Sequence, residues 1–477
     1  MKLHIKSVLL FTANRYVCYA MNFVRGILIA KFMGPYIYGV WSLLTLLQSY
    51  MIYSGFGLQF ATSIELSTGL VPESSTHNKI INVAFTLTLL LSFFLCILTW
   101  GGIHYGSPIF VNSTGQEYLL MLAFIAGLYN IQSLLINVYR VYRKLSKIAF
   151  SEITTALISL LVVFFFKDRA LIWASLVSMM MSMIIGISVF MINSPFTIKL
   201  SLDARVCSKL LSIGIPLLIY NSSFILITMI GRTIIGLYYP IEIMGYYSFA
   251  NAISSTSVLA VDAIAWIFFP TILSKTHEGV NNELVLAALN KIKVLYITAV
   301  TIIILIIIIM LPVLLNFLPI YKPAQETLTV LLLSQALLSI SFADNCLALA
   351  RKKQVIITAI SLLTVGIISG LSMIAAVQKL DFLWVAVSVF IGTFVYNILQ
   401  GYFGYYLLNK SWKVDIKELQ PWRNVFVILI VLSGALSGHS QLLNVVALMI
   451  FTLIKRRQIK ELYVYGITKL RPTEIKA

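Results

Sequence analysis

Long apolar stretches recur from one end of this chain to the other, separated by short polar connections. A bilayer core of about 30 Å needs a helix of about 20 apolar residues, and of the fourteen apolar stretches all but the last two approach or exceed that length. Because every backbone polar group in a bilayer must be satisfied internally, the pattern predicts an all-α integral membrane protein with 12 to 14 membrane-spanning helices. The predicted spans are Val8 to Ala30, Val40 to Ile64, Ile80 to Trp100, Tyr118 to Tyr139, Phe150 to Phe166, Ala170 to Ile192, Leu210 to Tyr238, Tyr246 to Leu273, Val294 to Leu315, Leu328 to Ala350, Val355 to Val377, Phe382 to Leu408, Val425 to Leu436 and Leu442 to Ile454.

The orientation of the helices follows from the basic residues in alternate connections, because cytoplasmic loops retain Lys and Arg. The N-terminus, every second loop and the C-terminal tail hold 27 of the 35 Lys and Arg residues, and the other loops hold 5. We therefore predict that both termini are cytoplasmic. The last two spans are short, but a single helix through both would place the basic tail outside, so a tight hairpin is predicted.

The composition agrees with a lipid environment, since 60% of the residues are hydrophobic and 11% are charged, against about 25% charged in soluble domains. The net charge of +18 is carried by short loops between apolar runs, which is typical of membrane topology and argues against nucleic-acid binding. The four cysteines and five histidines show no metal-ligand spacing, so neither a metal nor another cofactor is predicted. The N-terminal stretch contains Arg15 and Arg25 and is predicted to be the first span, not a cleaved signal.

An internal repeat relates the first span to the seventh. Asn14 and Arg25 lie eleven residues apart, as do Asn221 and Arg232, at an offset of 207. Gly39-Val-Trp-Ser42 has a counterpart in Gly245-Tyr-Tyr-Ser248 at an offset of 206. Because the offset matches the length of six helices, the halves are expected to be parallel repeats related by an axis along the membrane normal.

The repeat predicts two six-helix lobes around a central cavity, followed by a terminal helix pair. The expected boundaries are residues 1–192 for the N-terminal lobe, 193–209 for a cytoplasmic linker, 210–408 for the C-terminal lobe and 409–477 for the terminal hairpin and basic tail. Lobes of this kind can rock about a site near the bilayer midplane, which is what alternating access requires.

Polar residues interrupt the apolar pattern on one face of the first span. Arg15, Cys18, Asn22 and Arg25 follow steps of 3, 4 and 3 residues, which return to the same side of a helix. The seventh span repeats the pattern with Asn221, Thr228 and Arg232. An arginine near the bilayer centre costs about 2.5 to 3.5 kcal/mol on insertion scales, so we expect these side chains to line a wet cavity. Alternatively, Arg25 and Arg232 extend to the outer headgroups from positions near their helix ends.

A cavity lined by guanidinium groups favours an anionic cargo. Guanidinium presents planar pairs of donors that match phosphate and carboxylate, whereas an exporter of cationic drugs or metals would need carboxylates here. The candidate binding residues are Asn14, Arg15, Asn22, Arg25, Asn221, Thr228 and Arg232. No catalytic residues are predicted.

Glu152 lies near the start of the fifth predicted span, and two acids lie further inside spans, Asp262 in the eighth and Asp344 toward the cytoplasmic end of the tenth. Each of these two could be a salt-bridge partner of a basic residue or a coupling site for a proton or another cation. The sequence leaves both roles open.

The segments Arg25 to Gly39 (RGILIAKFMGPYIYG) and Gly231 to Ser248 (GRTIIGLYYPIEIMGYYS) resemble the repeated signature of bacterial polysaccharide transporters, the Wzx-type O-antigen flippases. The resemblance implies membership of the superfamily that includes MATE multidrug exporters and lipid II flippases. It also implies a cargo, an oligosaccharide unit on undecaprenyl pyrophosphate, moved from the cytoplasmic to the periplasmic leaflet of the inner membrane for O-antigen or capsule assembly. Membrane lipids and the polysaccharide polymerase and chain-length proteins are the other candidate partners.

Two other classes of function are weighed against this hypothesis. If the protein were a MATE-type exporter of small molecules, deletion of its gene would change the drug susceptibility of the cells. A membrane-embedded polysaccharide polymerase or glycosyltransferase would be expected to carry a sizeable extramembrane loop with catalytic groups, but the longest connection here is about twenty residues and holds no paired acids. We therefore predict a transporter and not an enzyme.

Overall fold

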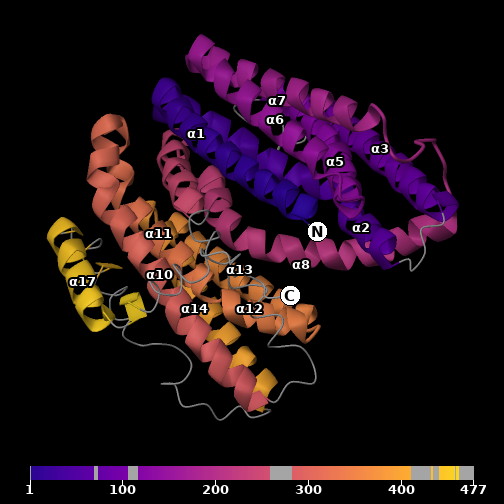
Figure 1. Cartoon of the computed structure of the whole chain (residues 1–477). Coiled ribbons are helices and arrows are strands. Elements are labelled where there is room, and N and C mark those ends of the chain that lie inside the picture. The colour runs from indigo at the N-terminus through magenta and orange to yellow at the C-terminus, as the bar shows by residue number, and fades with distance from the viewer. Residues whose placement is uncertain are drawn as a thin grey trace. The chain divides into compact units, whose positions relative to one another are not determined.

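Apolar helices make up almost all of the chain that the computed structural model describes, which is residues 2–68, 74–105, 116–257, 282–409, 431–432, 434, 440–456 and 458–460. Contacts between residues divide the chain into two compact units, Met1–Ser222 and Ser223–Ala477. Each unit is described separately below, and the helix labels are those of Figure 1.

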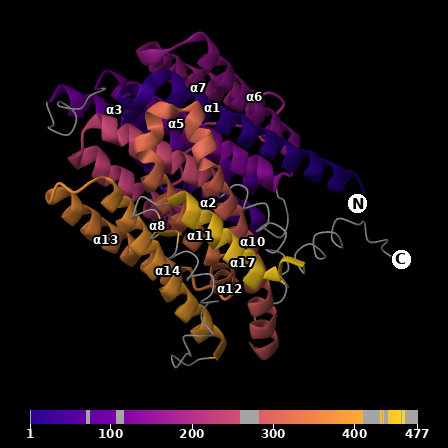
Figure 2. The same cartoon turned by 90° about the vertical axis from the view of Figure 1, so that its left-hand side faces the viewer.

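The N-terminal unit consists of a bundle of long helices with three short helical segments. Its elements are α1 (Lys2–Met51), the 3-10 turn Ile52–Gly55, α2 (Leu58–Thr68), α3 (Ser74–His104), the 3-10 turn Gln116–Tyr118, α5 (Leu119–Val141), α6 (Leu145–Phe165), α7 (Asp168–Met191) and the first part of α8 (Ala204–Tyr238). The helices α1, α6 and α7 lie side by side in both views, and α5 packs against α2, α3 and α7 (Figures 1 and 2).

Two breaks interrupt the helices of this unit at glycines. Within α1, Gly34 has φ 67° and ψ 170°, followed by Pro35, so the predicted first and second spans are two helices joined at this point. The predicted second span is itself broken at Gly55-Phe56-Gly57, where Phe56 (φ 45°) and Gly57 (φ 72°) have left-handed backbone. A methyl group on Gly57 would lie 2.2 Å from the carbonyl oxygen of Gly214 on α8, so glycine is what allows this close crossing.

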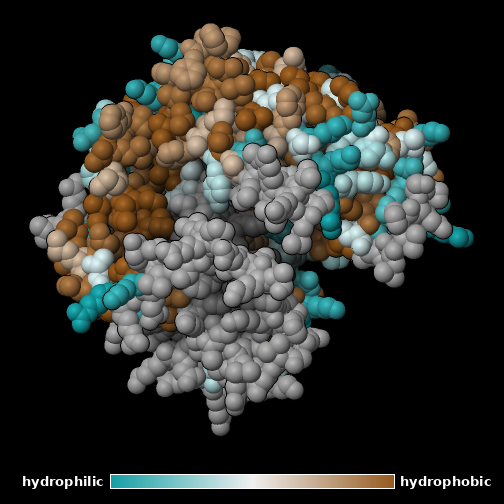
Figure 3. All heavy atoms as spheres, viewed as in Figure 1, coloured by the Kyte–Doolittle hydropathy of each residue, from teal (hydrophilic) through white to brown (hydrophobic). Residues whose placement is uncertain are grey.

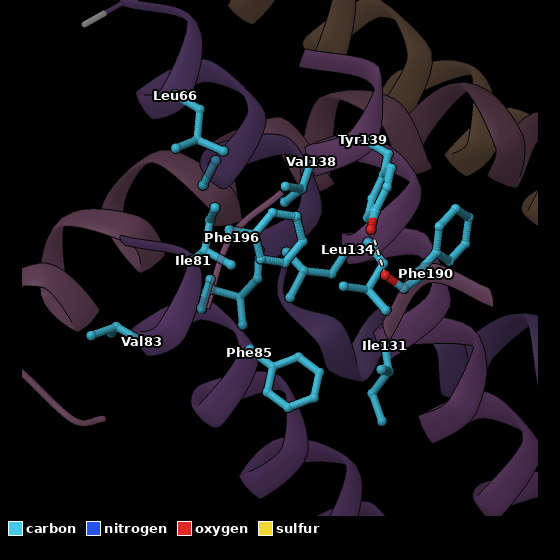
Figure 4. Close-up of a cluster of buried hydrophobic side chains, with 14 of the residues drawn as sticks. Leu66, Ile81, Val83, Phe85, Ile131, Leu134, Val138, Tyr139, Phe190 and Phe196 are labelled. Carbon is cyan, nitrogen blue, oxygen red and sulfur yellow. Dashed lines mark hydrogen bonds between the residues drawn. The ribbon is translucent and has the colours of Figure 1, made fainter. Parts of the chain in front are cut away.

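The core of the unit gathers where α2, α3, α5 and the end of α7 meet (Figure 4). Tyr139 on α5 is completely buried, its ring packs against Phe190 and Phe196, and its hydroxyl donates a hydrogen bond to the Phe190 carbonyl. Phe196 belongs to the segment after α7, so the predicted linker contributes a side chain to this core.

The predicted linker runs along α3 as an extended segment that is held by a ladder of hydrogen bonds. Asn78, Asn82 and Thr86 lie one turn apart on α3, and their side-chain oxygens accept the backbone N–H groups of Thr197 (3.4 Å), Lys199 (3.0 Å) and Ser201 (3.0 Å). The spacings match, because four residues of helix rise about 6 Å and two residues of extended chain span about 6.6 Å. The linker is therefore fixed to the N-terminal unit.

Two ion pairs complete this attachment. The carboxylate of Asp203 lies 2.6 Å from the Lys79 ammonium, and Glu65 lies 2.6 Å from Lys209. Asp203 also caps α8 by accepting the N–H groups of Arg205 (2.9 Å) and Val206 (3.2 Å). This cap explains why α8 begins at Ala204, six residues before the predicted seventh span.

Replacing Asn82 by alanine is expected to loosen the linker. One backbone N–H loses its acceptor, which should raise the local opening equilibrium by about 2- to 10-fold. Tryptic cleavage after Lys199 in the detergent-solubilised protein measures this opening. Thr88→Val is the control, because Thr88 lies on the same helix but bonds within it, to Ala84. Equal cleavage rates for both variants would refute the ladder.

The stability contributed by Asp203 is expected to depend on pH. The hydrogen bond from Lys79 and the N–H groups of Val206 and Arg205 hold the pKa of this carboxyl below its ordinary value. Because the folded-state pKa is lowered, the contribution is complete above the unfolded value of about 3.9 and is lost as the pH falls through the lower folded value. The difference in unfolding temperature between the wild type and Asp203→Asn should therefore be constant from neutral pH to about pH 5 and should close below about pH 4. A difference that persists in strong acid would contradict this.

The C-terminal unit begins inside α8 and continues through a helix over residues 241–257, as far as the structure describes it. Its further elements are α10 (Asn282–Phe317), the 3-10 segment Pro319–Ala324, α11 (Gln325–Ile340), α12 (Phe342–Ala350), α13 (Gln354–Val377), α14 (Leu383–Asn409) and α17 (Ser440–Ile454). The helix α14 packs against α11, α12 and α13 (Figure 2). The break before Pro240 falls at the position of the Gly34-Pro35 break in the first half, in agreement with the predicted repeat.

Ten described segments are long and apolar enough to cross a membrane: Ala13–Gly55, Thr76–His104, Leu119–Val141, Leu145–Phe165, Asp168–Met191, Ala204–Tyr238, Lys293–Phe317, Pro319–Leu349, Gln354–Val377 and Leu383–Leu407. The first of these contains most of predicted span 1 and the first part of span 2, and the others correspond to spans 3 to 7 and 9 to 12. The eighth and thirteenth spans lie largely outside the described residues, and the fourteenth is the shorter apolar helix Asn444–Ile454. Apolar side chains cover much of the described surface in Figure 3, as expected of a multi-pass membrane protein.

Candidate functional site

The helix α1 positions four of the predicted site residues, and its contacts with α6 determine which of them are buried. Asn14 donates a hydrogen bond to the carbonyl of Ala149 on α6 (3.1 Å) and contacts the sulfur of Cys18 at 3.8 Å. Cys18 is buried, whereas Asn22 is exposed. The predicted polar face therefore has a packed edge toward α6 and an open edge.

Arg15 has a counter-ion that sequence reasoning did not assign. Its Nε lies 3.8 Å from a carboxylate oxygen of Glu152 on α6, and its guanidinium lies 5.8 Å from the ring centres of both Phe11 and Tyr19. The side chain is 36% exposed, so part of it stays accessible to solvent. In the sequence, Glu152 stands out as an acidic residue within an apolar run, which marks it as a candidate partner for a basic residue.

Arg25 lies in a different environment, ten residues further along α1. Its Nε and Nη2 atoms are buried and have no hydrogen-bond partner among the described residues. A buried guanidinium nitrogen without an acceptor is costly, since hydrogen bonds to charged groups are worth about 1.5 to 3 kcal/mol. Arg25 is thus the predicted residue whose geometry most clearly calls for an anionic group from outside the described chain.

The corresponding residues of α8 are distributed over both units. Asn221, in the N-terminal unit, donates to the Leu217 carbonyl (2.8 Å), and Thr228, in the C-terminal unit, donates to the Ile225 carbonyl (2.8 Å). Both polar groups are therefore engaged within their own helix, unlike Asn14, which reaches a neighbouring helix.

Arg232 lies half-buried in the C-terminal unit, where the nearby Tyr247 is almost completely buried. The adjacent Gly231 packs tightly there, because a methyl group on it would lie 2.2 Å from the Tyr247 hydroxyl oxygen. In the N-terminal unit the structure brings Asn14 into contact with Cys18. In the C-terminal unit it places Arg232 near Tyr247.

Of the two predicted acids, Asp262 lies outside the described residues. Asp344 forms an ion pair with Lys293, whose ammonium lies 2.6 Å from its Oδ1. Lys293 had been assigned to a loop, but α10 begins at Asn282, so this lysine lies inside the helix. The predicted ninth span began one residue too late to include it.

Comparison with known proteins places this arrangement in a family. The sequence pattern of the family described as "Polysaccharide biosynthesis protein" matches residues 28–290, more than half of the chain. The chain belongs to the polysaccharide biosynthesis protein family. No curated protein sequence matches this member of the family.

Solved structures share the fold of this family member at low sequence identity. An inward-facing MATE multidrug resistance transporter of the MOP superfamily is 14% identical, with a TM-score of 0.66 over 82% of this chain and 94% of that one. The lipid II flippase MurJ in an inward closed conformation is 13% identical, with a TM-score of 0.68 over 94% of this chain and all of that one. A MOP superfamily transporter from Pyrococcus furiosus is 12% identical, with a TM-score of 0.58 over 86% and 96% of the two chains. The predicted all-α membrane fold of this superfamily is therefore confirmed.

Proposed function

We propose that this protein is a flippase that moves undecaprenyl-pyrophosphate-linked oligosaccharide units from the cytoplasmic to the periplasmic leaflet of the bacterial inner membrane. The units would serve O-antigen or capsular polysaccharide assembly, in keeping with the polysaccharide biosynthesis family. The observation that carries the proposal is the guanidinium of Arg25, whose Nε and Nη2 are buried without an acceptor among the described residues. A pyrophosphate supplies paired anionic oxygens of the kind that a guanidinium binds in bidentate fashion.

Arg15 and Glu152 add a second element to this proposed site. An anion approaching the partly exposed Arg15 competes with a carboxylate held at 3.8 Å, a distance at the outer limit of an ion pair. The anion can therefore gain this contact without breaking a tight hydrogen bond. From the sequence repeat, Arg232 is proposed as a further contact for the anion, and Asn14, Asn22, Asn221 and Thr228 are proposed as polar contacts.

Transport would proceed by alternating access of the two repeats, residues 1–192 and 210–408, with both termini in the cytoplasm. The linker is hydrogen-bonded to α3, and Lys209 at its end forms an ion pair with Glu65. The linker would therefore move with the N-terminal lobe. A change in the angle between the lobes would then occur inside α8 beyond Gly214, which the Gly57 turn crosses, in the stretch that contains Pro216.

Complementation of a deletion strain tests the proposed function. A strain lacking the protein should accumulate the lipid-linked unit in the cytoplasmic leaflet with sugar transfer intact, and the wild-type gene should restore surface polysaccharide. The variant with glutamine at Arg15, Arg25 and Arg232 should fail to restore it although it reaches the membrane. Full restoration by that variant would refute the site. Loss of sugar transfer in the deletion strain would instead favour an enzyme, and a changed drug-susceptibility profile would favour a MATE-type exporter.

A further inference from the structure

A second group of polar side chains lies deep in the C-terminal unit, remote in sequence from the arginines of α1. Asp344 on α12 is 7% exposed and pairs at 2.6 Å with Lys293 on α10. Both belong to segments apolar enough to cross a membrane, Lys293–Phe317 and Pro319–Leu349. A charged pair inside membrane helices is costly to build, and such residues mark ion or substrate pathways more often than structural sites.

A third helix, α14, packs beside this ion pair, and its surface leaves space for the Asp344 carboxylate. A methyl group on Gly404 would lie 2.4 Å from Asp344 Oδ1, so glycine leaves space for the oxygen that faces Lys293. A larger residue would displace the carboxylate from its position. The pocket for Asp344 is thus formed jointly by α10, α12 and α14.

Neutral polar side chains continue from Asp344 along α14. Asn345 Oδ1 accepts hydrogen bonds from the Tyr396 hydroxyl (3.1 Å) and from the Gln400 amide. Gln400 is fully buried, and its Oε1 has no donor among the described residues. Buried acceptors in proteins are nearly always satisfied, so Oε1 marks a place for a water or a protonated group.

The pair also determines which ion the site can take. The Lys293 ammonium occupies the position beside the carboxylate in which a sodium ion would sit. A proton needs no such position, because it binds covalently to a carboxylate oxygen. Protonation leaves a neutral acid beside the ammonium and removes the attraction that holds α10 to α12. Among the described residues, the titratable groups near Asp344 are Lys293 from α10, Tyr396 from α14 through Asn345, and Cys346 on α12 itself.

We propose that Asp344, held by Lys293 and Gly404, is a proton-binding site that couples transport to a pH gradient and does not accept sodium. The proposal rests on the proposed flippase function. Topology from basic residues places this end of both helices toward the cytoplasm, so the proton would exchange with that side. The step is the transfer of one proton to a carboxylate oxygen of Asp344, reversed when the ion pair forms again.

The leaflet distribution of the lipid-linked unit in proteoliposomes tests the coupling. With the membrane potential clamped at zero, a gradient of one pH unit should change the steady-state ratio between leaflets by about tenfold for one coupled proton, and a sodium gradient should not change it. Asp344→Asn and Lys293→Gln should abolish the response to pH. Glu326→Gln, an exposed acid on α11, is the matched control and should respond like the wild type. A full pH response in Asp344→Asn, or a sodium response in the wild type, would overturn the proposal.

Infrared difference spectroscopy of the purified protein provides a readout that needs no transport. The wild type should show a carboxylic acid C=O band that titrates with pH, Asp344→Asn should lack it, and Asp344→Glu should show it at a shifted frequency. Absence of a band that depends on Asp344 overturns the proposal even if the asparagine variant folds poorly. A wild type that shows the band but moves no lipid-linked unit contradicts the flippase function instead and leaves the proton site standing.

Discussion

Replacing Arg25 by glutamine is expected to lower the rate of lipid-linked oligosaccharide flipping by about 10- to 100-fold. The substitution removes the charge and most of the donors of a side chain whose Nε and Nη2 lack an acceptor in the described chain. The loss corresponds to one charge-assisted contact with the pyrophosphate, worth about 1.5 to 3 kcal/mol. Flipping in proteoliposomes, normalised to the amount of folded protein, gives the rate.

Two further variants separate charge from geometry at this position. Arg25→Lys keeps the charge but loses the planar pair of donors, so its rate should lie between those of the wild type and the glutamine variant. Lys31→Gln removes an exposed charge from the same helix and should leave the rate unchanged. If Lys31→Gln and Arg25→Gln reduce flipping equally, the effect comes from overall charge and the assignment of Arg25 is wrong.

Replacing Gly57 by alanine is expected to lower the free energy of unfolding by about 2 to 5 kcal/mol. The backbone at Gly57 has φ 72°, which is strained for any residue with a side chain, and the new methyl group would lie 2.2 Å from the Gly214 carbonyl oxygen. The opposing atom belongs to backbone, so it cannot move aside as a flexible side chain would. Thermal or detergent-induced unfolding of the purified protein measures the effect.

Gly366→Ala is the matched control for this substitution. Gly366 also lies in a membrane helix, but a methyl group on it would meet nothing within 4 Å among the described residues. Its stability should stay within about 1 kcal/mol of the wild type or rise slightly, since alanine favours a helix. Equal losses in both variants would show that the crossing of the Gly57 turn with α8 does not stabilise the unit.

The sequence predicts the helices and the break between the first two spans because those features depend on local chemistry. Apolar length marks the spans, and glycine followed by proline marks the turn at Gly34. The division of the predicted tenth span at Ser341 has no such mark. There the Leu337 carbonyl receives a hydrogen bond from the Asn397 amide (3.1 Å), which also donates to the Ser341 hydroxyl (2.9 Å). A donor sixty residues away stabilises that break, so a local pattern does not show it.

The candidate site divides in the same way. Helical spacing was enough to put Arg15 and Arg25 on one face of the first helix, and the intramembrane position of Asp344 was enough to single it out. Their surroundings depend on helix packing, as with Glu152 beside Arg15 and Lys293 beside Asp344. Lys293 was missed because a basic residue at a span boundary is counted as a loop residue. The attachment of the linker was also missed, because the side chains on α3 that hold its backbone leave no periodic signal in the sequence.

Flipping of the lipid-linked unit by the purified protein alone tests the proposed function most directly. Proteoliposomes with undecaprenyl-pyrophosphate-linked oligosaccharide in both leaflets are treated with a membrane-impermeant sugar-modifying reagent, and the modified fraction is followed over time. Vesicles with the wild-type protein should progress to near-complete modification, whereas vesicles with Arg25→Gln should lag far behind. If modification stops at the outer-leaflet fraction with the folded wild-type protein, as it does in vesicles without protein, the proposed function is contradicted.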